Sequence, residues 1–169
     1  MKLHIGGKEK KEGWKILNIQ KSNNVDYIGD IRDLSQFDDK SVSEVYASHV
    51  VEHVDQKKIQ DTLKGVFRIL KENGKFYISV PDMEILCRIF LDPKAPTKVK
   101  FHTMRMMFGG QIDDFDYHYF GWNYEFLNDY LTETGFKKIE RVKSFNLFND
   151  TSDYAPYGLP ISLNVLAYK

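Results

Sequence analysis

Polar or flexible residues follow the ends of four short apolar runs in this chain. Gly6 and Gly7 come after the first run, Gln20 ends the second, Asp30 follows the third, and His49 follows the fourth. Glycines let a backbone approach a ligand closely, amides and carboxylates bind hydroxyls and amines, and a histidine exchanges protons near neutral pH. Together these residues indicate a ligand site at which a proton can be moved.

The four ends meet at one place if the runs are parallel strands, because open parallel sheets bind ligands beyond the carboxyl ends of their strands. There, Gln20 would hydrogen-bond a diol, and Asp30 would accept a hydrogen bond from an exocyclic amine while Ile31 packs on the ring. Each feature has an ordinary alternative: a plain turn at the glycines, an exposed strand end at Gln20 and a local cap at Asp30.

Two histidines, His49 and His53, close the fourth run. One of them is expected to be structural, because a histidine at a helix start often only satisfies backbone groups. The three aspartates of residues 113–116, with His118, form a conceivable oxygen-rich metal set. Acidic loop residues are usually solvated, and the single cysteine, Cys87, lacks metal-ligand spacing, so no metal is predicted.

The elements that must position these residues alternate between strand and helix patterns, which is typical of an α/β fold with a largely parallel sheet. The predicted strands are Lys2–Ile5, Ile16–Gln20, Asp26–Gly29, Glu44–Ser48, Lys75–Val80, Lys138–Val142 and Leu163–Tyr168. The last two have no complete helical crossover between them and can be antiparallel. Only Gly6–Lys15 joins the first two, which is shorter than a helical crossover normally needs.

Apolar residues at helical spacing predict helices over Gln56–Lys71, Met83–Leu91, Thr97–Phe108 and Tyr124–Thr134. Asp55, Asp82 and Asn123 stand where N-caps are expected. Asn73-Gly74, Gly109-Gly110 and Gly135 stand where left-handed residues end helices.

The strand ends, in this order, resemble the class I S-adenosylmethionine-dependent methyltransferases, and specifically the small methyltransferases of the type 11 kind. The matching segments are Leu3-His4-Ile5-Gly6-Gly7, Gly13-Trp14, Asn18-Ile19-Gln20, Asp30-Ile31, Tyr46-Ala47-Ser48-His49-Val50-Val51-Glu52-His53, Arg68-Ile69-Leu70-Lys71-Glu72-Asn73-Gly74, Ser79-Val80-Pro81-Asp82, Phe108-Gly109-Gly110-Gln111, Tyr117-His118, Gly135-Phe136 and Ser162-Leu163-Asn164-Val165. The resemblance spans nearly the whole chain.

The resemblance implies a Rossmann-like, mostly parallel seven-stranded sheet with a final antiparallel strand, helices on both faces and a first crossover shortened to a loop. It also implies S-adenosylmethionine as cofactor. The residues carried over to the cofactor site are Ile5, Gly6, Gly7, Gln20, Asp30, Ile31, Ser48 and His49. Two positions depart from the family pattern: Lys8 stands where its second glycine is expected, and Gln20 stands where an acid usually holds the ribose. Losing one charged hydrogen bond costs about 1.5–3 kcal/mol, which weakens binding without forbidding it.

The implied reaction is methyl transfer to a small-molecule or sugar-containing acceptor. We expect His118 to act as the base for a hydroxyl acceptor and His49 to contact the cofactor or the substrate. Residues 92–122 would form a substrate-side insert in a single domain of residues 1–169. Its aromatic residues would make an apolar lid, or the helix Thr97–Phe108 would simply pack by Val99, Met106 and Met107.

Composition narrows the possible partners. The 169 residues carry 24 basic and 24 acidic side chains, a formal net charge of zero, which disfavours nucleic acid as a partner. No apolar run approaches the roughly 18 residues of a membrane span, and no signal peptide is evident, so neither a membrane segment nor a leader is expected. One cysteine fits a reducing cytoplasm. The oligomeric state stays undetermined.

Two other functions compete with small-molecule methyl transfer. One is a catalytically degenerate methyltransferase-like module that binds a partner through its aromatic insert. The other is an RNA or protein methyltransferase, although the chain has no basic stripe with interleaved aromatic residues, which argues against RNA.

Overall fold

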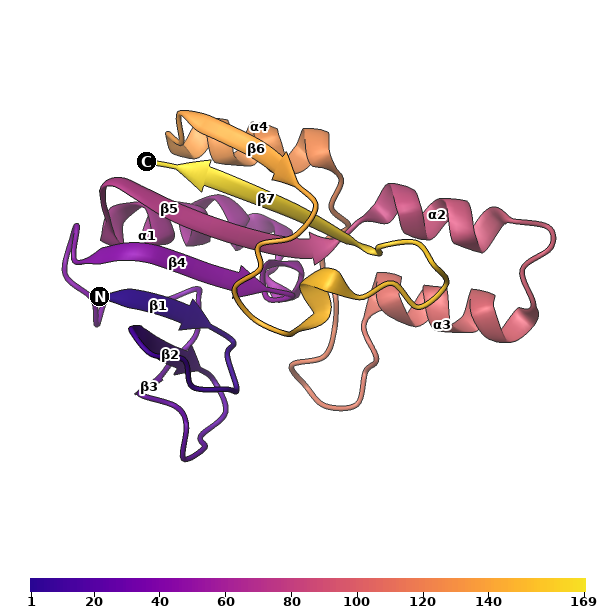
Figure 1. Ribbon diagram of the computed structural model, residues 1–169, viewed down its shortest axis with the longest axis horizontal. Helices are drawn as coiled ribbons and strands as arrows, with labels where there is room; N and C mark the ends of the chain where they lie inside the picture. The colour runs from indigo at the N-terminus through magenta and orange to yellow at the C-terminus, as the bar shows by residue number, and fades with distance from the viewer.

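Seven strands form one sheet in the order β3-β2-β1-β4-β5-β7-β6 in the computed structural model, which describes all 169 residues (Figure 1). The strands are β1 (Lys2–Ile5), β2 (Trp14–Asn18), β3 (Tyr27–Ile28), β4 (Val42–Ser48), β5 (Leu70–Pro81), β6 (Lys138–Val142) and β7 (Ser162–Tyr168). β3, β2, β1, β4 and β5 run parallel, whereas β7 lies antiparallel between β5 and β6. The predicted seven-stranded, mostly parallel sheet with an antiparallel last strand is confirmed.

The shortened first crossover is also confirmed. β1 and β2 pair in parallel, from Lys2 with Trp14 to Ile5 with Leu17, and the segment between them contains no helix. β2 begins and ends two residues earlier than predicted. Its start is set by Trp14, which is buried, whereas Ile19 and Gln20 at the predicted end are exposed.

The chain has four α-helices, of which α1 (Ile59–Ile69) lies between β4 and β5, and α2 (Met83–Leu91), α3 (Thr97–Phe108) and α4 (Tyr124–Thr134) lie between β5 and β6. The last three have the predicted bounds. Asp82 Oδ1 accepts hydrogen bonds from the amides of Glu84 and Ile85, and Asn123 caps α4 in the same way. Gly135 ends α4 with a φ of 115°, as the left-handed cap requires.

The predicted helix Gln56–Lys71 is wrong at both ends. Its first turn is a 3₁₀ turn, η2 (Gln56–Lys58), and the Asp55 side chain makes no capping hydrogen bond. The helix stops at Ile69 because Leu70 is fully buried and pairs with Val42 as the start of β5. Asn73 does adopt a left-handed conformation, with a φ of 60°, but within β5 rather than at a helix end.

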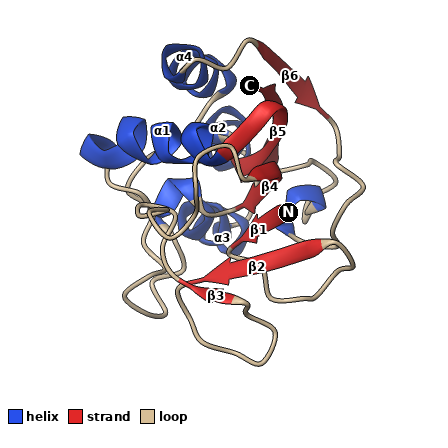
Figure 2. Cartoon of the chain, turned by 90° about the vertical axis from the view of Figure 1, so that its left-hand side faces the viewer, coloured by secondary structure: helices blue, strands red, loops and turns tan.

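The main core lies on one face of the sheet, under α1 and α4. Leu3, Ile5, Val45 and Ile78 point from β1, β4 and β5 into a cluster of 26 buried residues that includes the apolar faces of both helices. Figure 2 shows these helices on one side of the sheet. Burial of this size supplies the main driving force for folding.

The opposite face is covered differently from the expectation of helices on both faces. Aromatic rings gather there: His4, Trp14, Tyr46 and Tyr77 from the strands, with Phe145 and Phe148 from the segment after β6. That segment contains only the 3₁₀ turn η3 (Thr151–Asp153), and the Tyr46 hydroxyl donates to Asp150 Oδ2 at 2.8 Å. Irregular backbone covers this face because the connections after β1 and β2 contain no helix.

Helices α2 and α3 pack on each other and extend beyond the end of the sheet (Figure 1). A small second cluster, Leu86, Ile89 and Ile161, is packed by Val99, Met106 and Met107 among others. The predicted packing face of the Thr97–Phe108 helix is therefore confirmed. None of the helices is long and apolar enough to cross a membrane.

We predict that His4 makes the protein acid-sensitive. The residue is 7% exposed, and burial lowers the pKa of His4 from 6.5 to about 4, partly opposed by the nearby Asp150 carboxylate. Between pH 6.5 and about 4 the histidine is protonated in the unfolded chain but not in the folded chain. The free energy of unfolding therefore falls as pH drops, by up to about 3 kcal/mol. Urea unfolding of wild type and His4→Phe at pH 7.5 and 4.5 checks this. An equal loss in both proteins would contradict it.

Candidate functional site

Two cavities lie at the carboxyl end of β1, on either side of the loop that begins at Gly6. The first has a volume of about 500 Å³ and is lined from the ends of β1, β2 and β4, the loop after β3 and the insert. β1 pairs with β2 on one side and β4 on the other, so strand order reverses at this point. A ligand site is expected where parallel strand order reverses.

Six of the predicted site residues line this first cavity, namely Ile5, Gly6, Gln20, Asp30, Ile31 and His49. Gly7 and Ser48 line the second cavity instead. His118, the expected base, lines neither of them. The structure thus brings together most of the predicted residues but leaves His118 behind the cavity wall.

The glycine loop is held by a main-chain hydrogen bond, and the Val50 side chain leaves no room for a Cβ at Gly6. The Gly6 amide donates to Leu17 O at 2.8 Å, and Gly6 has a φ of 77°. A Cβ atom there would lie 2.7 Å from Val50 Cγ2. Asn18, a buried residue that the sequence analysis named in a matching segment but did not assign to the site, donates from Nδ2 to Gly7 O at 2.9 Å. A polar residue at the end of an apolar strand was the available signal, since buried amides need partners.

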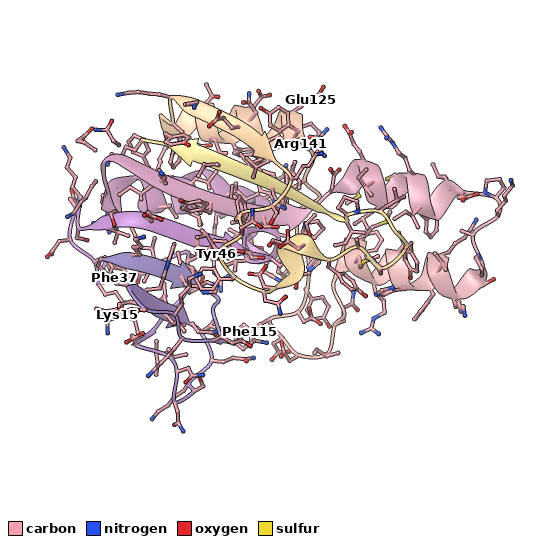
Figure 3. All side chains as sticks on the ribbon, in the orientation of Figure 1. Lys15, Phe37, Tyr46, Phe115, Glu125 and Arg141 are labelled. Atoms are coloured by element: carbon pink, nitrogen blue, oxygen red, sulfur yellow. The ribbon has the colours of Figure 1, made fainter.

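Part of the insert lines the first cavity. Ile112, Phe115 and Tyr119 line it, and Figure 3 shows Phe115 near the end of β2. Gln20 Nε2 lies 3.5 Å from Asp113 Oδ2, so a carboxylate stands beside the position where the family pattern has an acid. The sequence analysis missed this role because nothing local connects Asp113 to the end of β2.

Asp30 is already paired inside the site. Its carboxylate accepts from the Arg32 amide and side chain at 2.5–2.9 Å. Burial alone would raise the pKa of Asp30, but the Arg32 guanidinium and amide hold it below its usual value. Asp30 is therefore ionised at neutral pH and keeps acceptor capacity for an amine.

His49 stands between the two cavities and lines both. It has a φ of 53°, and its amide donates to Ser79 O at 2.9 Å. Its Nε2 lies 2.9 Å from Ser162 Oγ and its Nδ1 lies 3.2 Å from Glu52 Oε1. The order serine, histidine, glutamate is that of a hydrolase triad, but Ser162 lines neither cavity and its hydroxyl donates to Thr151 O, so no nucleophilic role follows.

Glu52 is completely buried, in the 3₁₀ turn η1 (Val51–His53), and neither carboxylate oxygen has a hydrogen-bond partner. Burial would raise the pKa of Glu52, but His49, His53 and His118 together hold it below its usual value. Burial also lowers the pKa of His118. The group is an ionised carboxylate among imidazoles, an electrostatic arrangement that sequence spacing did not reveal.

The second cavity has a volume of about 330 Å³ and a largely polar lining. Lys8, Ser48, Asn149 and Asp150 offer donors and acceptors, and Phe148 supplies the one apolar side chain. Lys8 also lines the first cavity. A small polar molecule fits this lining better than an apolar one.

Comparisons with known proteins agree with this architecture. Residues 10–78 match the family model described as a methyltransferase domain. A SAM-dependent methyltransferase from Archaeoglobus fulgidus aligns with a TM-score of 0.60 and 18% identity, over 99% of this chain and 85% of the other. A putative methyltransferase from Haloferax volcanii, solved with the Trm112 activator, aligns with a TM-score of 0.58 and 14% identity, over 98% of this chain and 80% of the other.

A possible histamine N-methyltransferase from Thermotoga maritima aligns with a TM-score of 0.52 and 20% identity, over 86% of this chain and 65% of the other. The search of curated protein sequences finds no match. The fold is that of the class I S-adenosylmethionine-dependent methyltransferases, and the matching residues 10–78 contain the ends of β2, β3 and β4 that line the first cavity.

We predict that Gly6→Ala destabilises the protein more than Gly13→Ala. Both glycines have a φ near 80°, which costs about 1–2 kcal/mol for alanine, but only Gly6 would also clash with Val50. Overpacking of this kind adds about 1–3 kcal/mol. Urea unfolding measures the difference, and adding Val50→Ala should recover part of it. Equal losses in the two single variants would contradict the crowded loop.

Proposed function

We propose that this protein, which has the class I methyltransferase fold, transfers the methyl group of S-adenosylmethionine to a small-molecule or sugar-containing acceptor. The observation that carries the proposal is the first cavity, formed where strand order reverses and lined by six of the eight residues expected from the resemblance. Its volume of about 500 Å³ lies in the ordinary range for cofactor sites.

The residues present fit the cofactor. The backbone at Gly6, where a Cβ would collide with Val50, leaves close access for the methionine part. Gln20 with Asp113 suits a ribose diol, and Asp30 with Ile31 suits an adenine amine and ring. Lys8 adds a cation near the loop, complementary to a carboxylate.

The chain's own part in the reaction is mainly positioning. The cofactor, when bound, supplies an already activated methyl group. His49 stands at the junction of the two cavities, where the contacts of its Nδ1 with Glu52 and of its Nε2 with Ser162 fix the ring, so its role is to contact the cofactor or the acceptor. His118, the base expected from the sequence, lines neither cavity, so we assign the reaction to positioning and name no base.

We place the acceptor in the second cavity; residues 92–122, expected from the sequence to be a substrate-side insert, line the first cavity and not this one. The polar groups of Ser48, Asn149 and Asp150, with the Phe148 ring, suit the hydroxyls and one flat face of a sugar-like molecule. The zero net charge gives no reason to invoke nucleic acid. We also propose a cytoplasmic location, in line with the free and exposed Cys87.

We predict that S-adenosylmethionine and S-adenosylhomocysteine bind in the micromolar range. Gly6→Arg should abolish binding by filling the loop, and Asp30→Ala should weaken it at least tenfold. Asp33→Ala, in the same loop but outside the cavity, is the matched control and should bind normally. Calorimetric titration measures all four proteins. Absence of binding up to millimolar ligand would overturn the proposal.

We further predict which fraction of a cell extract accepts the methyl group. Incubation with methyl-labelled cofactor should label the low-molecular-mass fraction and not the RNA or protein fraction, and His49→Ala should reduce the rate. Label in RNA or protein would overturn the acceptor class. Cofactor binding with no transfer to any fraction would favour a degenerate binding module instead.

A further inference from the structure

We infer that Glu52, His53 and His118 form a binding site for a divalent transition-metal ion such as zinc. The bound ion would link the insert, which contains His118, to the turn after β4, which contains Glu52 and His53. One ligand atom of each residue lies within 4.8 Å of the others. In a tetrahedral zinc site with bonds of 2.0–2.2 Å, ligand atoms stand about 3.4 Å apart. Side-chain rotations on metal binding would bring the three ligand atoms from within 4.8 Å to the shorter spacing of a zinc site.

The buried carboxylate is the first reason to expect a cation. Glu52 is fully buried, and its Oε2 has no hydrogen-bond partner. Its one close polar contact is His49 Nδ1, at 3.2 Å from Oε1. A buried, ionised carboxylate is normally paired or coordinates a metal, because leaving it unpartnered is costly.

The orientation of the two histidines is the second reason. His53 Nδ1 lies 3.0 Å from Tyr117 O, and His118 Nδ1 lies 3.0 Å from Met106 O. A carbonyl oxygen only accepts, so in both rings Nδ1 carries the hydrogen and Nε2 keeps its lone pair. Metal-binding histidines are held in this way by carbonyl partners on their other nitrogen.

The ligand set also indicates the class of ion. Two imidazoles and one carboxylate suit zinc or another first-row transition ion, whereas magnesium and calcium prefer oxygen alone. Three protein ligands leave a fourth position for water, as in zinc sites that are not purely structural. This set differs from the aspartates of residues 113–116, which line the first cavity.

The site would join two parts of the chain that already touch. The Tyr119 amide donates to Glu52 O at 2.8 Å, and the rings of His53 and His118 meet edge to face at 4.8 Å. His53 and Tyr119 both line the first cavity. A bound ion would therefore fix the insert where it lines this cavity.

Zinc titration of the metal-free chain, without cofactor, tests the inference. We expect one equivalent of zinc to bind, with a rise in Tm, and cobalt to give the visible absorption of a four-coordinate site. Glu52→Gln and His118→Ala should each weaken zinc binding at least tenfold, with folding checked by circular dichroism. His102→Ala, which alters another histidine of the same insert, is the matched control and should bind zinc as wild type does.

Zinc binding that is absent, or equally strong in Glu52→Gln, His118→Ala and wild type, would overturn the inference. If both variants fail to fold, the cobalt spectrum of the wild-type chain decides: no four-coordinate absorption would overturn it. Cofactor binding is measured separately, so a chain that binds S-adenosylmethionine but not zinc would leave the proposed function standing. A chain that binds zinc but not S-adenosylmethionine would support the zinc site and overturn the proposed function.

Discussion

The parallel pairing of β1 with both β2 and β4 is the constraint on which the rest of the molecule depends. Hydrogen bonds on both edges of β1 place its carboxyl end in the middle of the sheet, between strands that lead the chain in opposite directions. Loops on either side must diverge there, which opens the two cavities around Gly6. Close packing of Gly6 against Val50 then keeps the loop tight.

A second consequence follows from the short connections after β1 and β2. With no helix in either, one face of the sheet would expose Trp14 and Tyr46 to water. Residues 143–160 cover that face instead, anchored by the hydrogen bond from Tyr46 to Asp150 and by Phe148. The same segment supplies Asn149 and Asp150 to the second cavity, so one piece of chain both covers the core and forms a wall of this cavity.

The buried Glu52 links the sheet to the insert. Its carboxylate contacts His49 Nδ1 at 3.2 Å, and the neighbouring rings of His53 and His118 are held by carbonyl oxygens of the insert. The insert therefore contributes to the electrostatics beneath the site as well as to the wall above it. This explains why His118, chemically the obvious base, lies behind the cavity rather than in it.

Local patterns in the sequence were enough to predict the strands, three helices with the caps Asp82, Asn123 and Gly135, and five residues of the first cavity, to which the family resemblance added Ile5. These features depend on neighbours along the chain and on the rule that parallel strand ends meet. The tertiary structure alone decided the end of α1, where pairing of Leu70 with Val42 outweighed helical periodicity. It alone placed Asp113 beside Gln20 and His118 beside Glu52, because contacts between distant segments depend on how the insert packs, which no local spacing records.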